Sequence, residues 1–142
     1  MPESVDGAYA PAPSLADELA VFDEFGTPTT VGVTEVNGPS GRVSVDTFTN
    51  EFWTSKQRAA NRLHEVSYRA CFKPQLPRFF IDRLTSAGDV VYDPFMGRGT
   101  TLLEAALAGR APAGCDINPL SEIIVRPRLE PPELREVEAR LG

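Results

Sequence analysis

The sequence has 142 residues, 42% of them hydrophobic, with two cysteines, one histidine and a net charge of −6. This length allows one domain at most, and the two cysteines form neither a CxxC pair nor a cluster with His64, which disfavours a disulfide framework and a metal site. There is no basic-then-apolar leader and no long apolar run, so we expect no membrane insertion and a cytoplasmic location.

The first part of the chain is acidic. Residues 1–46 carry eight acidic side chains and one basic side chain. Residues 1–28 are predicted to be a flexible leader, with one helical turn near residues 14–21. Two β-prone runs, 29–36 and 42–48, flank the five-residue loop Asn37-Gly38-Pro39-Ser40-Gly41. This pattern predicts a β-hairpin over residues 29–49, for which the sequence indicates no function.

The next part is the basic one. Residues 47–88 carry seven basic and three acidic side chains. A helix capped at residues 54–55 and continuing to Leu63 would place three basic residues on its polar face, and His64 behind it reads as structural or as a hydrogen-bond donor. Local basic residues account for most nucleic-acid affinity, although a solvated basic face gives the same pattern. The three are Lys56, Arg58 and Arg62.

A second helix is predicted after residue 74. Pro74 and Pro77 favour an extended lead-in followed by a helix start. Apolar side chains then recur at helical spacing until Gly88, which is predicted to end the helix. They are Leu76, Phe79, Phe80 and Leu84.

Residues 89–118 have the order strand, glycine-rich turn, helix, strand. The first strand is predicted over 89–92, and the turn Asp93-Pro94-Phe95-Met96-Gly97-Arg98-Gly99 interrupts it. Thr100 is a plausible N-cap for an apolar helix that ends near Gly109. A second strand is predicted over 113–117. It places Asp116 at its carboxyl end, 23 positions after Asp93.

This arrangement suits a nucleoside ligand. In an open parallel sheet the ligand lies over the carboxyl ends of the strands, and an acidic residue about 20 positions beyond the first turn accepts hydrogen bonds from a ribose. The phosphate-binding G-x-G-x-x-G is missing, and Asp93 opens the turn with a carboxylate. A nucleoside with a positively charged tail therefore fits better than a dinucleotide.

Two further helices are predicted after Asp116. Asn118-Pro119 favours the start of a short helix to Val125, which the prolines from Pro127 onward would end. Residues 131–142 form a last helix with a narrow apolar stripe, Leu134, Val137 and Leu141.

The turn resembles the D-P-F-x-G-x-G-T-T signature of S-adenosylmethionine-dependent DNA amino-methyltransferases, the adenine-N6 and cytosine-N4 enzymes. Lys73-Pro74 with the apolar run behind it resembles their K-P-x-x-L segment, and Gly114 to Pro119 resembles the acidic end of their second strand. The similarity covers roughly residues 50–130. Arg98 departs from the usual serine, and Asp116 stands where glutamate is common.

The resemblance implies an α/β fold with part of a Rossmann-like methyltransferase sheet, S-adenosylmethionine as cofactor and DNA as partner, in the setting of restriction-modification. It implies that the tail of the cofactor lies at Asp93 and the Phe72-Lys73 segment, the ribose at Asp116 and the adenine at Ile117-Asn118. The cofactor residues carried over are Phe72, Lys73, Pro74, Asp93, Pro94, Phe95, Gly97, Gly99, Thr100, Thr101, Asp116, Ile117 and Asn118.

The catalytic tetrapeptide of these enzymes, (D/N/S)-P-P-(Y/F/W), does not occur in the sequence. The one Pro-Pro pair, Pro131-Pro132, is followed by Glu133. We therefore assign no catalytic residue and expect a cofactor-binding part that a second chain or segment completes. An inactive remnant, a non-enzymatic interaction module and a small-molecule methyltransferase stay open as alternatives.

Overall fold

A computed structural model describes residues 13–53, 60–66 and 72–142. The chain divides into two compact units, Met1–Phe52 and Trp53–Gly142, which are treated separately below.

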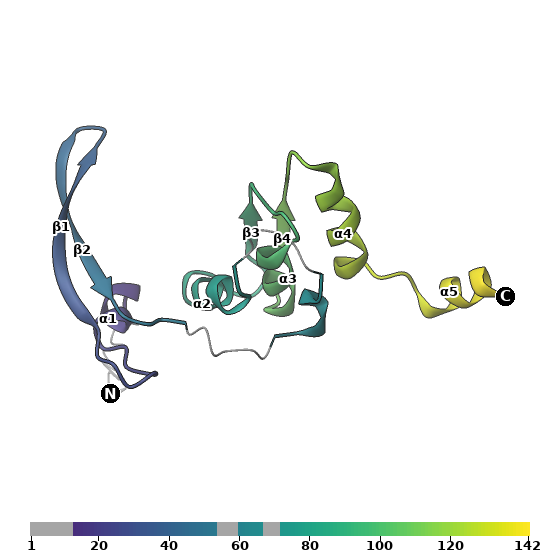
Figure 1. Cartoon of the computed structure of the whole chain (residues 1–142), viewed down its shortest axis with the longest axis horizontal. Helices are drawn as coiled ribbons and strands as arrows, with labels where there is room; N and C mark the ends of the chain where they lie inside the picture. Colours follow the sequence, from purple (N-terminus) through teal and green to yellow (C-terminus); the bar gives the residue numbers. More distant parts are fainter. Residues whose placement is uncertain (1–12, 54–59, 67–71) are drawn as a thin grey trace, which may run out of the picture. The chain divides into compact units, whose positions relative to one another are not determined.

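The N-terminal unit contains one short helix and one hairpin. Helix α1 (Leu15–Ala20) begins with a capping box between Ser14 and Asp17. Strand β1 (Thr30–Gly38) pairs antiparallel with β2 (Gly41–Thr49), as Figure 1 shows. The predicted hairpin is present, but its loop is two residues rather than five. Gly41 has a φ of 118°, which lets the chain reverse within this short turn.

The base of the hairpin is fixed by contacts that the sequence does not suggest. Phe22 is buried against Phe25 and Phe52. The amide nitrogen of Asn50 donates to the carbonyl oxygens of Phe22 and Thr27, both at 2.8 Å. These bonds anchor the end of β2 to the segment that precedes β1.

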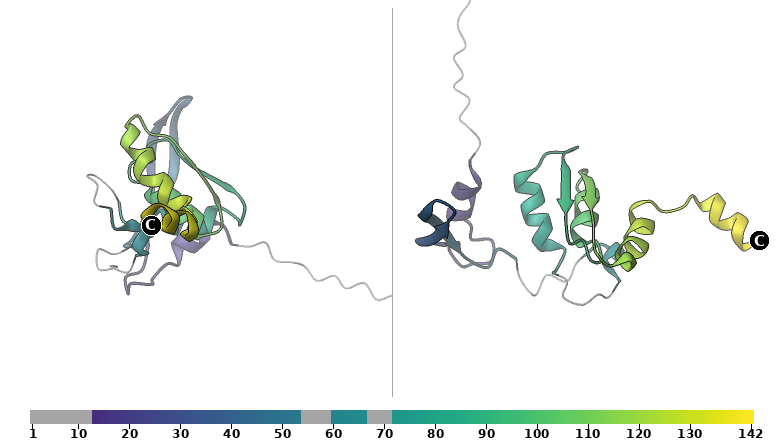
Figure 2. Two further views of the ribbon diagram at one scale, coloured as in Figure 1. Left: turned by 90° about the vertical axis from the view of Figure 1, so that its right-hand side faces the viewer. Right: turned by 90° about the horizontal axis from the view of Figure 1, so that it is seen from above.

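The C-terminal unit is built around one parallel strand pair. Strand β3 (Val90–Asp93) pairs with β4 (Ala111–Gly114) in a register that aligns Asp93 with Gly114. Helix α3 (Thr100–Leu107) connects the two strands and packs on them, as Figures 1 and 2 show. This order confirms the α/β class and the predicted strand, turn, helix, strand sequence.

The core of this unit lies around α3. Leu102, Leu103 and Ala105 are at most 4% exposed. Helix α2 (Gln75–Leu84) covers α3 with Phe79 and Ile81, and η1 (Arg62–His64) and α4 (Pro119–Leu129) contact α3 from other directions. Of the four apolar residues predicted at helical spacing, Phe79 is buried and Leu76 is half-buried, whereas Phe80 and Leu84 are exposed.

Several predicted boundaries were wrong. Strand β4 ends at Gly114, so Asp116 lies two residues beyond it rather than at its end. Helix α2 ends at Leu84, before Gly88, because the backbone of Thr85 is extended, with φ −137° and ψ 158°, and the hydroxyl of Thr85 bonds to the carbonyl of Ile81. Helix α4 continues through Pro127 to Leu129.

The helix predicted to begin at residues 54–55 falls partly on residues 54–59, which lie outside the described residues. Within the described part, Asn61 is extended and caps the short η1 helix through Leu63. A continuous helix through Leu63 is therefore not formed. The last helix, α5 (Leu134–Leu141), has no buried residue. None of the described helices combines the length and apolar character needed to cross a membrane.

Candidate functional site

The glycine-rich turn between β3 and α3 is held by its own backbone and by Asp93. Oδ1 of Asp93 accepts a hydrogen bond from the amide of Phe95 at 2.9 Å. The amide of Gly99 donates to the carbonyl of Met96 at 2.6 Å. Gly97 and Gly99 have φ values of 50° and 80°, in the left-handed region that glycine tolerates best.

The N-cap of α3 corrects the sequence-based prediction. Gly99 occupies this position, and Thr100 is the first helical residue. The Thr100 side chain is buried, and its hydroxyl oxygen accepts a hydrogen bond from Nε of Arg98 at 3.0 Å. Thr100 therefore fixes the side chain of Arg98 instead of capping the helix.

Asp116 connects the glycine-rich turn to the loop that follows β4. Its Oδ2 accepts from the amide of Gly97 at 2.8 Å, and its Oδ1 accepts from the amide of Asn118 at 2.8 Å. These backbone bonds, first that of Asn118 and then that of Gly97, lower the pKa of Asp116 below its usual value. Asp116 is thus a carboxylate at neutral pH that holds the glycine-rich turn against the loop after β4.

The lowered pKa of Asp116 predicts how the turn responds to acid. Because its folded-state pKa lies below the unfolded value of 3.8, the carboxylate stabilises the fold above pH 3.8, and this contribution is lost as the pH falls through the folded-state pKa. We expect the side-chain carbon resonance of Asp116 to titrate below pH 3.8. A midpoint at or above 3.8 would contradict the two backbone hydrogen bonds.

Apolar side chains are exposed around Asp93 and Asp116. Phe95 in the turn is 85% exposed, and Ile117 beside Asp116 is fully exposed. Tyr92, the residue before Asp93, is also exposed. These apolar side chains are free of the core and are therefore accessible to a ligand at the turn.

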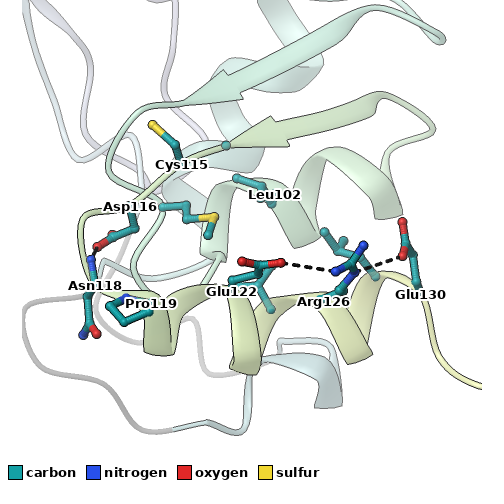
Figure 3. A pocket seen from close by; sticks show the side chains of 12 residues that line it. Leu102, Cys115, Asp116, Asn118, Pro119, Glu122, Arg126 and Glu130 are labelled. Atoms are coloured by element: carbon teal, nitrogen blue, oxygen red, sulfur yellow. Dashed lines mark hydrogen bonds and ion pairs between the residues drawn. The ribbon is translucent and has the colours of Figure 1, made fainter.

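A cavity of about 370 Å³ adjoins Asp116. Figure 3 shows Cys115 and Asp116 on one side, and Glu122 and Arg126 of α4 with Glu130 directly after that helix on the other. Arg126 pairs with both glutamates, at 3.2 and 3.6 Å. Of the predicted cofactor residues, Asp116 and Asn118 line this cavity.

The remaining predicted cofactor residues lie in three settings. Pro94 and Phe95 are exposed in the turn, Gly97 and Thr101 are half-buried, and Gly99 is buried. Phe72 and Lys73 are exposed, whereas Pro74 is buried and lines a separate cavity, also about 370 Å³, with Arg78 and Glu104. The structure therefore brings Asp93, the glycines, Asp116 and Asn118 together through backbone contacts, and leaves residues 72–74 apart from the cavity beside Asp116.

The predicted DNA-contacting residues are described in part. Arg62 is exposed at the start of η1, while Lys56 and Arg58 lie outside the described residues. His64 is buried, and its Nε2 lies 2.7 Å from Oε1 of Glu104. His64 makes the structural hydrogen bond that its lone position in the sequence indicated.

The geometry defines a strand, glycine-rich turn, helix, strand unit with a fixed carboxylate two residues beyond the second strand, an arrangement similar to that of enzymes that bind nucleoside cofactors. A family model described as DNA methylase, of the N6 and N4 methyltransferases, matches residues 28–125. The chain belongs to this family.

Curated relatives agree with this assignment. The Type II methyltransferase M.MjaII of Methanocaldococcus jannaschii is 32% identical over 85 residues, 59% of this chain and 16% of the relative. The Type II methyltransferase M.MvaI of Kocuria varians is 36% identical over 83 residues, 56% of this chain and 18% of the relative. A tRNA (guanine(10)-N2)-dimethyltransferase of Methanocaldococcus jannaschii is 36% identical over 63 residues, 44% of this chain and 18% of the relative.

The chain thus spans less than a fifth of the length of these curated relatives. No solved structure matches the chain. Within residues 13–53, 60–66 and 72–142, no group of three or more histidine, cysteine or acidic side chains is placed to hold a metal ion.

Proposed function

We propose that this chain binds S-adenosylmethionine over the carboxyl ends of β3 and β4 and is the cofactor-binding part of a site-specific DNA amino-methyltransferase. The target would be the exocyclic amine of adenine or cytosine. The observation that carries the proposal is Asp116, a carboxylate held beside the glycine-rich turn by the amides of Gly97 and Asn118. Membership of the DNA methylase family supports it.

The residues present fit this cofactor. Each oxygen of Asp116 accepts one backbone amide, and a carboxylate oxygen has a further lone pair with which it can accept a ribose hydroxyl. The exposed side chain of Ile117 offers an apolar surface for the adenine ring. One oxygen of Asp93 bonds to the amide of Phe95, and its other oxygen can face the positively charged tail.

These positions indicate what the cofactor and the residues of this chain would each contribute. The cofactor supplies a methyl group on a positively charged sulfur, and the residues of this chain bind and orient it. Enzymes that modify a base in duplex DNA first take it out of the stack. The groups that grip the amine of that base are absent from this sequence, so we propose that a second chain or a further segment supplies them.

RNA is a second candidate substrate. The similarity to a tRNA dimethyltransferase favours it, because that relative acts on an exocyclic base amine in RNA, as its name states. Competition between duplex DNA and tRNA for the cofactor-loaded chain distinguishes the two. A chain that binds the cofactor but neither of the two nucleic acids would favour a small-molecule methyltransferase.

The test is a calorimetric titration of the chain with S-adenosylmethionine. We expect saturable binding that Asp116→Asn weakens roughly tenfold or more, because hydrogen bonds to a charged acceptor are worth about 1.5–3 kcal/mol. Glu122→Gln is the matched control, since Glu122 lines the same cavity but is exposed and pairs with Arg126. A folded chain that does not bind would overturn the proposal and favour an inactive remnant.

A further inference from the structure

Two arginines join the glycine-rich turn to the segment 62–66, which begins with Arg62, the last of the predicted DNA-contacting residues. Nη1 of Arg98 donates to the carbonyl oxygens of His64 at 3.3 Å and Val66 at 2.9 Å. Its Nε donates to Thr100, as described above. The one side chain in the turn that departs from the usual serine of the resembling enzymes therefore reaches across to another segment.

Arg128 makes the complementary contacts from α4. Its Nη1 donates to the carbonyl of Leu63 at 2.8 Å, and its Nη2 donates to the carbonyl of Arg98 at 2.6 Å. Its Nε bonds to the carbonyl of Ile124 within its own helix at 2.7 Å. The planar guanidinium fixes the relative position of all three carbonyls, because its donors form a rigid fork.

This arrangement places two cations close together. Burial, followed by the positive charge of Arg98, lowers the pKa of Arg128, and Glu65 partly offsets this. Repulsion between the two guanidinium groups opposes their approach. Backbone carbonyls from three segments are what hold them in place.

We propose that Arg98 and Arg128 are positioning residues that hold the segment 62–66 and the glycine-rich turn as one unit. The carbonyl of Arg98 is fixed by Arg128, and the amides on either side of it are fixed by Asp116 and Met96. An ordered glycine-rich turn therefore favours an ordered segment 62–66. One consequence rests on the proposed function. A cofactor bound at the turn would order the segment 62–66, which is part of the surface that would meet nucleic acid.

Amide hydrogen exchange of the purified chain tests the pair without any ligand. The amides to follow are those of His64 and Glu65, bonded within η1, and those of Gly97 and Gly99 in the turn. In Arg128→Gln we expect all four to exchange about fivefold faster or more, the effect of losing one net hydrogen bond. Amides in the core of α3 report that the variant is folded.

Arg126→Gln is the matched control on the same helix, because Arg126 is 69% exposed and, within the described part of the chain, pairs only with Glu122 of α4 and Glu130 at its C-cap. We expect the four amides to exchange in Arg126→Gln at the same rate as in the wild type. Arg98→Ser should speed exchange at residues 64–65, and Arg98→Lys should restore most of the protection, since one nitrogen makes both of the contacts to His64 and Val66. Equal exchange in Arg98→Ser and the wild type would overturn the proposal.

Adding S-adenosylmethionine separates positioning from simple stabilisation. We expect the cofactor to slow exchange at residues 64–65 in the wild type, and to do so far less in Arg98→Ser at saturating concentration. The same slowing in both proteins would overturn the coupling. If the wild type binds no cofactor, the proposed function fails, and the ligand-free comparison of the arginine variants still decides whether the two segments act as one unit.

Discussion

Gly99→Ala is expected to lower the free energy of unfolding of the C-terminal unit by about 3 kcal/mol, through backbone strain and overpacking. Gly99 has a φ of 80° and is the N-cap of α3. A Cβ at this position would lie 2.6 Å from Cγ2 and 2.9 Å from Cγ1 of Val125. Val125 is 3% exposed on α4, so its side chain has little room to move away.

Gly109→Ala separates the two causes. Gly109 has a similar φ of 73°, but a Cβ there would meet nothing within 4 Å. It should therefore cost about 1 kcal/mol, the strain of the left-handed backbone alone. Urea denaturation followed by circular dichroism measures both variants. Equal losses in the two would show that the contact between Gly99 and Val125 is not tight.

A second substitution tests the contact directly. Val125→Ala in the Gly99→Ala background removes both methyl groups that the new Cβ would meet. We expect the double variant to be more stable than the sum of the two single losses predicts, because residues in contact are not additive. Strict additivity would mean that α4 has moved to admit the Cβ.

The local features of the site could be predicted because each is set by a few consecutive residues. Asp93 to Gly99 combines a carboxylate, a proline and two glycines within one turn, so the break after β3 is visible in the sequence. The apolar run of α3 is equally clear. The roles of Asp93 and Asp116 toward a ligand remain predictions, whereas their contacts to the backbone are observed.

The position of β4 could not be predicted, because tertiary contacts decide it. Ala111-Pro112-Ala113-Gly114 has low β propensity, and the sequence favours the run that begins two residues later. Arg110 places the strand by donating to the hydroxyl and carbonyl of Thr85, at 2.9 and 2.7 Å. The amide of Ala111 then bonds to the carbonyl of Asp89.

Contacts between distant residues were also invisible in the sequence. Arg128 and Leu63 are 65 positions apart, and His64 and Glu104 are 40 apart. Neither pair belongs to a periodic pattern or a motif. Arg128 also contributes to the last turn of α4, around Pro127. The bond from its Nε to the carbonyl of Ile124 and the bond from Glu130 to the carbonyl of Arg126 support the last turn, where proline has removed a donor.

Glu104→Ala is expected to be the second strongly destabilising change, at about 3 kcal/mol, the cost of leaving a buried polar partner unpaired. Glu104 is 7% exposed and His64 is 8% exposed. His64 Nε2 bonds to Glu104, while its Nδ1 is buried with no hydrogen-bond partner among the described residues. Removing Glu104 therefore leaves both ring nitrogens of His64 without a hydrogen-bond partner among the described residues.

Asp82→Ala is the matched control, because Asp82 and Glu104 both pair with Arg78. Nε of Arg78 lies 2.7 Å from Oδ2 of Asp82, but both side chains are about two-fifths exposed. Arg78 lies 3.8 Å from the buried Glu104. We expect Asp82→Ala to cost less than about 1 kcal/mol, as exposed ion pairs do.

Glu104→Gln distinguishes the two partners of Glu104. The amide oxygen can still accept a hydrogen bond from Nε2 of His64, while the charge that attracts Arg78 is lost. We expect a loss of about 1 kcal/mol, close to that of an ordinary hydrogen bond or a partly exposed ion pair. A loss as large as that of Glu104→Ala would show that charge, rather than the hydrogen bond to His64, holds η1 against α3.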